Sequence, residues 1–174
     1  MRNIKAIIFD AYGTLFDVNS AAERCKNKIG NKWESFANYW RTTQLEYTWL
    51  RSIMDRHKDF WQITEDSLDK SMKAFKIDKG MKKELLDLYK ILSPYPEVKE
   101  TLKKLREKEY KVAILSNGTP DLLNELVDSN NLKGLFDNIF SIEKVGIFKP
   151  SSRVYDMPII KYGIQKEEVM FLSA

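Results

Sequence analysis

Two kinds of hydrophobic pattern divide this chain. In its second half, short apolar runs that suit buried strands alternate with amphipathic segments typical of helices. The predicted strands are residues 4–9, 111–117, 137–143 and 168–173, and the helices between the later ones are residues 97–108, 119–129 and 151–162. Alternating strands and helices predict a parallel sheet with right-handed crossovers. We therefore expect an α/β fold with a doubly wound sheet.

Residues 20–92 follow a different pattern. Apolar side chains recur there at helical spacing, as at Trp33, Phe36 and Trp40, and all four tryptophans of the chain lie in this stretch. Pro94 and Pro96 then interrupt the pattern. We predict an α/β core formed by residues 1–16 and 93–174, with a helical cap of residues 17–92 inserted after the first strand.

Composition narrows the class of protein. The 174 residues are 43% hydrophobic and 31% charged, which is ordinary for a folded domain, and no apolar run is long enough to cross a membrane. Basic residues exceed acidic ones by only 29 − 25 = 4, so we expect neither a nucleic-acid nor a membrane partner. Cys25 is the single cysteine and cannot form an internal disulfide, which favours a cytoplasmic protein.

The sequence FDAYGTL (residues 9–15) places an acid at the end of the first predicted strand. A carboxylate there is held over the edge of the sheet, near the backbone N–H groups of the next turn, which suits Asp10 to act as a nucleophile. The alternative is an aspartate that merely caps the turn before Gly13. Thr14 either orients Asp10 or caps the same turn.

Two later motifs follow predicted strands as well. ILSNGTP (114–120) offers the hydroxyl of Ser116 and the amide of Asn117 to an anion, or forms an ordinary strand–helix turn in which Thr119 caps a helix. In VGIFKPSSRVY (145–155), Lys149 can reach a carboxylate at the neighbouring strand end and keep it ionised. Lys144 is the competing candidate, and a solvated lysine is the alternative.

Taken together, these motifs resemble the haloacid dehalogenase superfamily, and the inserted helical block resembles its C1-type cap. Within the superfamily, FDAYGTLFDV (9–18), WRTTQLEYTWLRSIM (40–54), ILSNGTP and KPSSRVY (149–155) are similar to segments of the (S)-2-haloacid dehalogenases. The resemblance implies hydrolysis of short (S)-2-haloacids to (R)-2-hydroxyacids through an ester on Asp10. It also implies a homo-oligomer, such as a dimer, that needs no cofactor.

The resemblance assigns a role to each site residue. It implies that the catalytic group comprises Asp10, Thr14, Lys149, Tyr155 and Ser173, and that the substrate-binding group comprises Ala11, Tyr12, Arg41, Leu45, Phe60, Ser116 and Asn117. In the second group, Arg41 and Asn117 would receive the halide, while Ser116 and backbone N–H groups near Ala11 would hold the substrate carboxylate.

Tyr12 separates two branches of the superfamily. Phosphatases of this superfamily carry a second aspartate at that position, which protonates the leaving group and helps to hold Mg²⁺. A tyrosine is a poor acid at neutral pH, and a halide leaves without a proton. We therefore expect no metal site, and a phosphatase is the alternative function.

The last residues of the chain carry a further expectation. In the family, the final predicted strand continues into a loop of the form Ser-x-Asn-x-x-Asp, of which Ser173 matches the first residue and Ala174 stands at the second. The resemblance implies that the aspartate of this loop helps to activate water. We expect a C-terminally truncated core with impaired ester hydrolysis, and a catalytically dead remnant is the second alternative.

Overall fold

The computed structural model describes residues 3–174, which divide into two compact units. The α/β unit comprises the chain up to Asp17 together with Pro94–Ala174, and the helical unit comprises Val18–Ser93. These limits lie one residue from those expected from the sequence. They fall where they do because Phe16 forms a β-bridge with Pro94, and the N–H group of Tyr95 donates to the carbonyl of Leu15.

The α/β unit is built on a sheet of parallel strands in the order β3-β2-β1-β4. The strands are β1 (Ala6–Phe9), β2 (Lys111–Ser116), β3 (Asn138–Ser141) and β4 (Val169–Leu172). Ile8 of β1 is in register with Ala113 of β2 and Phe171 of β4. The predicted α/β class with a parallel sheet is thereby confirmed.

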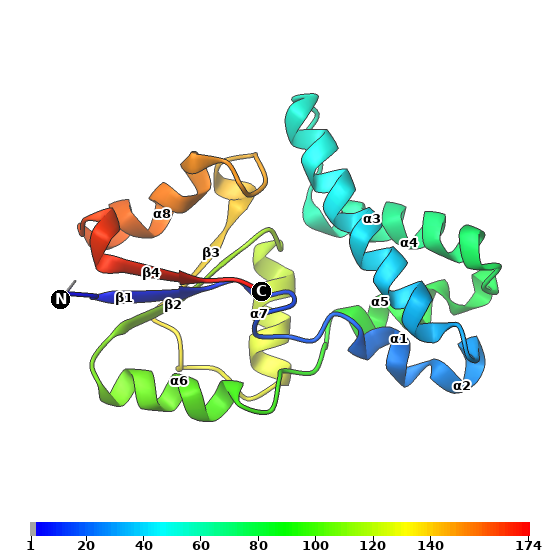
Figure 1. Ribbon diagram of the computed structural model, residues 1–174, viewed down its shortest axis with the longest axis horizontal. Coiled ribbons are helices and arrows are strands. Elements are labelled where there is room, and N and C mark those ends of the chain that lie inside the picture. The colour runs from blue at the N-terminus through cyan, green and yellow to red at the C-terminus, as the bar shows by residue number, and fades with distance from the viewer. Residues whose placement is uncertain (1–2) are drawn as a thin grey trace. The chain divides into compact units, whose positions relative to one another are not determined.

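Helices cover both faces of this sheet. They are α6 (Val98–Glu107), α7 (Pro120–Ser129) and α8 (Ser152–Tyr162). The steps from β1 to β2 and from β2 to β3 run in one direction and the step to β4 runs back, so right-handed crossovers place α6 and α7 on one face and α8 on the other. Figure 1 shows α6 and α8 on opposite sides of the strands.

The ends of the elements follow local side-chain chemistry. Thr119 caps α7 by accepting from the N–H group of Leu122, and Pro120 takes the first helical position, as predicted. The prediction for β3 was too long at its end. The hydroxyl of Ser141 accepts from the N–H group of Glu143, and residues Ile142–Lys144 turn into a 3₁₀ helix, η2. A second 3₁₀ helix, η3 (Lys166–Glu168), precedes β4.

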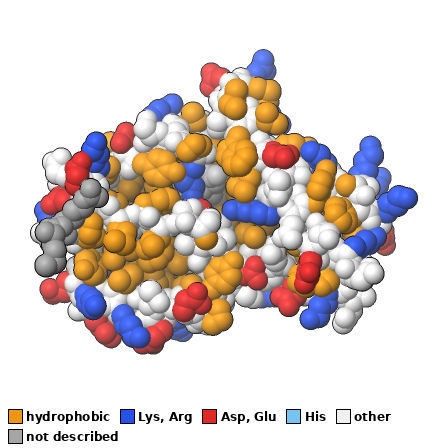
Figure 2. All heavy atoms as spheres, viewed as in Figure 1, with side chains coloured by type: hydrophobic (Ala, Val, Ile, Leu, Met, Phe, Trp, Pro, Cys, Tyr) orange, Lys and Arg blue, Asp and Glu red, His pale blue; other side chains and the backbone are white. Residues whose placement is uncertain are grey.

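The strands differ in how deeply they are buried. Every residue of β1 is buried, because β2 and β4 flank it and helices cover its faces. Along β4, by contrast, exposed and half-buried residues alternate, and Met170 and Leu172 are exposed. Figure 2 shows hydrophobic side chains gathered over β4, between α8 and α6. The first strand therefore provides the firmest support for the residue that follows it, Asp10.

The helical unit comprises α1 (Ser20–Arg24), α2 (Lys26–Ile29), α3 (Trp33–Ile53), α4 (Phe60–Phe75), η1 (Lys79–Met81) and α5 (Lys82–Tyr89). Figure 1 shows the long α3 lying against α4. An aromatic cluster joins three helices, since the Phe36 ring of α3 is 5.9 Å from that of Phe75 on α4, and the Trp40 ring of α3 is 5.2 Å from that of Tyr89 on α5. The predicted helical character of this region is confirmed.

Cys25 follows α1 and is buried, and burial raises the pKa of its thiol. Its environment is that of a packing residue rather than of a nucleophile. Across residues 3–174, the structure contains no helix with the length and hydropathy of a membrane span.

Candidate active site

Polar side chains gather where the parallel strands end. Asp10 follows β1, Ser116 ends β2, Ser141 ends β3 and Ser173 follows β4. Because parallel strands all end at the same edge of the sheet, these side chains share one edge, which is where α/β sheets bind ligands. The predicted site residues of the α/β unit are thus brought together by topology.

The Asp10 carboxylate is held on one oxygen. Oδ1 accepts from the N–H group of Ala11 at 2.7 Å and lies 2.6 Å from Nζ of Lys149. Oδ2 has a longer contact, 3.5 Å from the hydroxyl of Ser173. The side chains of Asp10 and Lys149 are only 13% and 12% exposed, so solvent screens this ion pair weakly. Oδ1 is therefore fixed, while Oδ2 keeps lone pairs that can attack an electrophile.

The turn after Asp10 holds itself together. The carbonyl of Ala11 accepts from the N–H groups of Thr14, Leu15 and Phe16, and Gly13 adopts a φ of +91°, which glycine tolerates best. The Thr14 hydroxyl accepts from the N–H group of Ala174 at 3.0 Å. Thr14 thus ties this turn to the segment after β4, and its influence on Asp10 passes through the turn rather than through a direct bond.

Lys149 is itself held from two sides. Its Nζ donates to the carbonyl of Leu115 at 3.3 Å, and its backbone N–H group donates to Oδ1 of Asn117 at 3.1 Å. The ammonium also lies over the Phe171 ring, 5.5 Å from its centre. The side-chain oxygen of Asn117, a residue predicted to bind halide, therefore accepts a hydrogen bond from the Lys149 loop. The NH₂ group of Asn117 takes no part in that bond.

Tyr155 packs beside the same ring. It lies on α8, and its ring meets that of Phe171 edge-on at 5.3 Å. Burial, and to a lesser extent the negative charge of Asp10, raises the pKa of Tyr155. The phenol therefore stays protonated at neutral pH and can act as a hydrogen-bond donor. Phe171, which the sequence analysis did not single out, supports both Lys149 and Tyr155.

Tyr12 fits against a glycine of the second motif. A Cβ atom on Gly118 would lie 2.9 Å from Cε2 of Tyr12, closer than real Cβ contacts, and 3.0 Å from the Tyr12 hydroxyl oxygen, which is unusually tight. The carbonyl of Gly118 accepts from the hydroxyl of Ser141 at 2.6 Å, and its N–H group donates to the hydroxyl of the fully buried Ser116. Gly118 and Ser141 were also missed. The sequence shows the glycine in SNGTP, but it does not show that this glycine lies against Tyr12.

Three of the predicted residues belong to the helical unit. Arg41 and Leu45 lie on α3 and are half-buried, and Phe60 is the first residue of α4 and is buried. Nη1 of Arg41 donates to Oε1 of Gln44 at 2.9 Å. The structure thus places these residues in the helical unit, whereas the predicted residues on or beside the Asp10 edge belong to the α/β unit.

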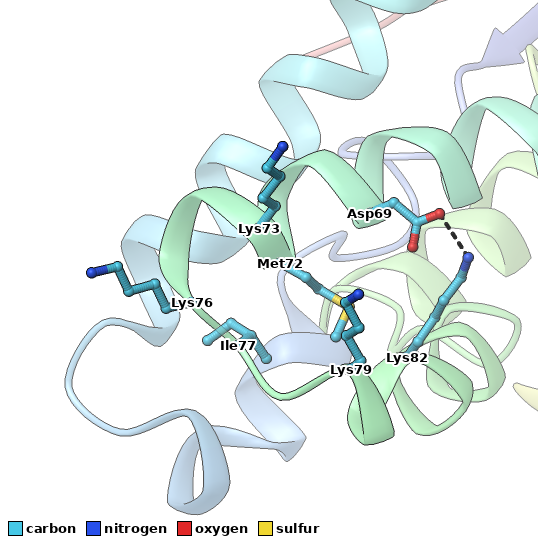
Figure 3. A pocket seen from close by; sticks show the side chains of 7 residues that line it. All are labelled: Asp69, Met72, Lys73, Lys76, Ile77, Lys79 and Lys82. Atoms are coloured by element: carbon cyan, nitrogen blue, oxygen red, sulfur yellow. Dashed lines mark hydrogen bonds and ion pairs between the residues drawn. The ribbon is translucent and has the colours of Figure 1, made fainter.

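The helical unit has a cavity of its own. A pocket of about 670 Å³ in the helical unit has an apolar floor and several lysines on its rim. Lys82 is paired with Asp69 at 2.8 Å, and Figure 3 shows the ammonium groups of Lys73 and Lys76 extending in different directions. Its charges do not converge on one point. Within residues 3–174, no group of three or more histidine, cysteine or acidic side chains is placed to hold a metal ion.

The chain is similar to known dehalogenases along its length. The haloacid dehalogenase-like hydrolase family matches residues 4–173. The (S)-2-haloacid dehalogenase 4A of Burkholderia cepacia is 38% identical over 99% of this chain and 75% of its own length. A crystal structure of a dehalogenase superposes with a TM-score of 0.96 at 38% identity, covering 99% of this chain and 77% of that one.

A further solved structure bears on the chemistry of the family. It is an L-2-haloacid dehalogenase from Xanthobacter autotrophicus with chloropropionic acid covalently bound, 37% identical, with a TM-score of 0.88 over 97% of this chain and 69% of that chain. Identity and coverage at this level establish common descent with proteins of that activity. The chain belongs to the (S)-2-haloacid dehalogenases of the haloacid dehalogenase-like hydrolase family.

Proposed function

We propose that this chain removes halide from short (S)-2-haloacids, with Asp10 as the nucleophile. The observation that carries the proposal is the asymmetry of the Asp10 carboxylate. Oδ1 is fixed by Ala11 and Lys149 at 2.7 and 2.6 Å, and Oδ2 is left with one long contact. A carboxylate held in this way has one oxygen to react and one to anchor.

In the first half-reaction, Oδ2 attacks the α-carbon from the side opposite the halogen. The new C–O bond forms as the C–X bond breaks, and the halide leaves with the bonding electron pair. Inversion gives the (R) configuration and an ester on Asp10. The positive charge of Lys149, 2.6 Å from Oδ1, suits it to steady the substrate carboxylate as well.

In the second half-reaction, water adds to Cγ of Asp10 and negative charge develops on Oδ1. The two groups already bound to that oxygen, the Ala11 N–H group and the Lys149 ammonium, then act as its oxyanion hole. Collapse releases the (R)-2-hydroxyacid, regenerates the carboxylate and liberates a proton. The family resemblance implied that the Ala11 N–H group binds the substrate carboxylate. Its bond to Oδ1 supports a role on Asp10 instead.

The remaining assignments complete the proposal. Arg41 receives the departing halide together with the amide of Asn117, and the apolar groups of Tyr12, Leu45 and Phe60 surround the carbon chain of the substrate. Ser116 binds the substrate carboxylate, and Tyr155, Thr14 and Ser173 orient Asp10. Tyr12 supports halide over phosphate chemistry, because the leaving halide needs no acid. The predicted homo-oligomer and cytoplasmic location stay predictions, and light scattering tests the first.

The test follows halide from each enantiomer of 2-chloropropionate. We expect release from the (S) form only, with (R)-lactate as the product. A single turnover in H₂¹⁸O with enzyme in excess should place the label in Asp10 rather than in lactate. Label in lactate after that first turnover would instead mean direct attack by water. Mg²⁺-dependent hydrolysis of p-nitrophenyl phosphate without halide release would favour the phosphatase.

A further inference from the structure

Gln44 is a buried polar residue in the helical unit. It lies on α3 and is only 1% exposed. Burying an amide is costly unless its donors and acceptor are satisfied. Here Nε2 donates to Oγ1 of Thr64 at 2.7 Å and to the hydroxyl of Tyr89 at 3.0 Å. Oε1 accepts from Nη1 of Arg41 at 2.9 Å and from the Tyr89 hydroxyl at 3.2 Å. The amide therefore links α3 to α4 and α5.

The orientation of this amide is fixed by Thr64. The Thr64 hydroxyl donates its only proton to the carbonyl of Phe60 at 2.8 Å, so toward Gln44 it can only accept. The NH₂ group of Gln44 must then face Thr64, which leaves Oε1 to face Arg41. The indole N–H group of Trp40 donates to the Thr64 carbonyl at 3.1 Å and fixes the same turn of α4.

The fixed amide of Gln44 restricts the side chain of Arg41. An arginine side chain has many rotamers, and a free one samples them. Arg41 and Gln44 are three residues apart on α3 and line the same small hollow with Trp40 and Tyr89. An acceptor that cannot turn away keeps the guanidinium in one place, and a planar cationic fork held in one place suits the capture of an anion.

We propose that Gln44 is a positioning residue that holds the Arg41 guanidinium for capture of the departing halide. The inference rests on the proposed function, in which Arg41 receives the halide. Gln44 acts through Arg41 and touches neither substrate nor nucleophile. Its loss should therefore raise the barrier to C–X cleavage in proportion to how much help the leaving group needs. Chloride is a poorer leaving group than bromide and needs more.

The test compares Gln44→Met with Ser71→Ala. Ser71 is fully buried on α4 and donates only to the carbonyl of Ser67, so its variant controls for a lost buried hydrogen bond. The measured quantity is the single-turnover rate for (S)-2-chloropropionate divided by that for (S)-2-bromopropionate. Misplacing a catalytic group can cost on the order of 10²-fold, so we expect Gln44→Met to lower this ratio by about fivefold. Ser71→Ala should leave it unchanged.

Two further measurements separate positioning from stability. In an Arg41→Lys background, Gln44→Met should change the ratio no further, because the group through which it acts is gone. By NMR relaxation, the Nε–H order parameter of Arg41 should fall in Gln44→Met and not in Ser71→Ala. Thr64→Val, which frees the amide to turn, gives the same direction with a smaller change if Gln44→Met does not fold.

The outcomes are distinct. An unchanged ratio in folded Gln44→Met, or an unchanged order parameter at Arg41, overturns the positioning role while leaving the proposed function intact. An equal effect with and without Arg41 also overturns it, because Gln44 would then act by another route. No halide from the unmodified chain overturns the proposed function, and the catalytic role of Gln44 with it.

Discussion

The two units hold their reactive groups by different means. At the Asp10 edge of the α/β unit, the bonds come largely from backbone groups, namely the N–H group of Ala11, the carbonyl of Leu115 and the N–H group of Lys149. In the helical unit, Arg41 is held by a chain of side chains. Strand ends place groups through the fold itself, whereas a helix surface needs a dedicated network. Substitution should therefore damage the two regions in different ways.

The largest expected effect comes from removing the proposed nucleophile. Asp10→Asn keeps the size of the side chain but replaces the reactive oxygen with an amide. We expect single-turnover halide release to fall by on the order of 10⁴-fold or more, as when other enzymes lose a nucleophile. Intact mass spectrometry should show no ester adduct on this variant.

Asp128→Asn is the matched control. Asp128 lies on α7, and its carboxylate is 3.8 Å from Nζ of Lys133 at the surface. This variant should keep the parent rate, because surface pairs contribute little. An adduct on Asp10→Asn, mapped to another residue, would remove the Asp10 edge from the chemistry.

Lys149→Met tests the anchor on Oδ1. Without the ammonium, the Asp10 carboxylate loses its closest partner, and the oxyanion of the second half-reaction loses a donor. Loss of one such donor costs about 10²–10³-fold in kcat. Rapid-quench kinetics should show both halide release and ester hydrolysis slowed.

Lys144→Met is the comparison that the sequence left open. Lys144 lies in η2 of the same loop region and is exposed. It should behave like the parent chain. If Lys144→Met proves the slower variant, the anchor has been assigned to the wrong lysine.

The fold and the position of Asp10 at a strand end could be predicted because both depend on local patterns. A buried run ending in Asp10, and alternating strands and helices, are visible one segment at a time. The roles of Phe171, Gly118 and Gln44 could not be predicted, because each depends on contacts with residues that are distant in the chain. Gln44 meets Thr64 and Tyr89 across three helices, and Gly118 matters because Tyr12 lies against it. The end of β3 was misplaced for a smaller reason, the cap that Ser141 provides.

Gly118→Ala tests one of these distant contacts. Its Cβ would lie 2.9 Å from Tyr12 and 3.0 Å from Cδ2 of Leu123, so the Tyr12 ring must move. Overpacking of this kind costs about 1–3 kcal/mol of stability. We expect KM for the haloacid to rise as well, because Tyr12 borders the proposed substrate site. Urea unfolding and steady-state kinetics measure the two effects.

Gly80→Ala is the control for the added methyl group. The atoms nearest to a Cβ at Gly80 belong to the Asp78 side chain, and the shortest of these distances is 3.5 Å, which is an ordinary contact. Stability and KM should stay near those of the parent. A Gly118→Ala chain with parent stability and KM would show that Tyr12 has room to spare.

The smallest expected effect is found by comparing two tyrosines of α8, Tyr155 and Tyr162. Tyr155 lies beside the Asp10 edge, while burial and then the charge of Asp137 raise the pKa of Tyr162 from 10.0 to about 12. Between these pH values the unfolded chain has lost the Tyr162 proton and the folded chain has kept it. Stability from this group is thus complete below pH 10 and falls as the pH rises toward 12. Tyr162→Phe should flatten that fall in urea unfolding between pH 9 and about 12, and its halide release at neutral pH should match the parent.

Tyr155→Phe should slow halide release, because its phenol donor serves the Asp10 edge. If Tyr162→Phe slowed the reaction as much as Tyr155→Phe, the chemistry would not be confined to one end of the sheet. It would then be wrong to distinguish a reactive Asp10 edge from a purely structural remainder of the α/β unit.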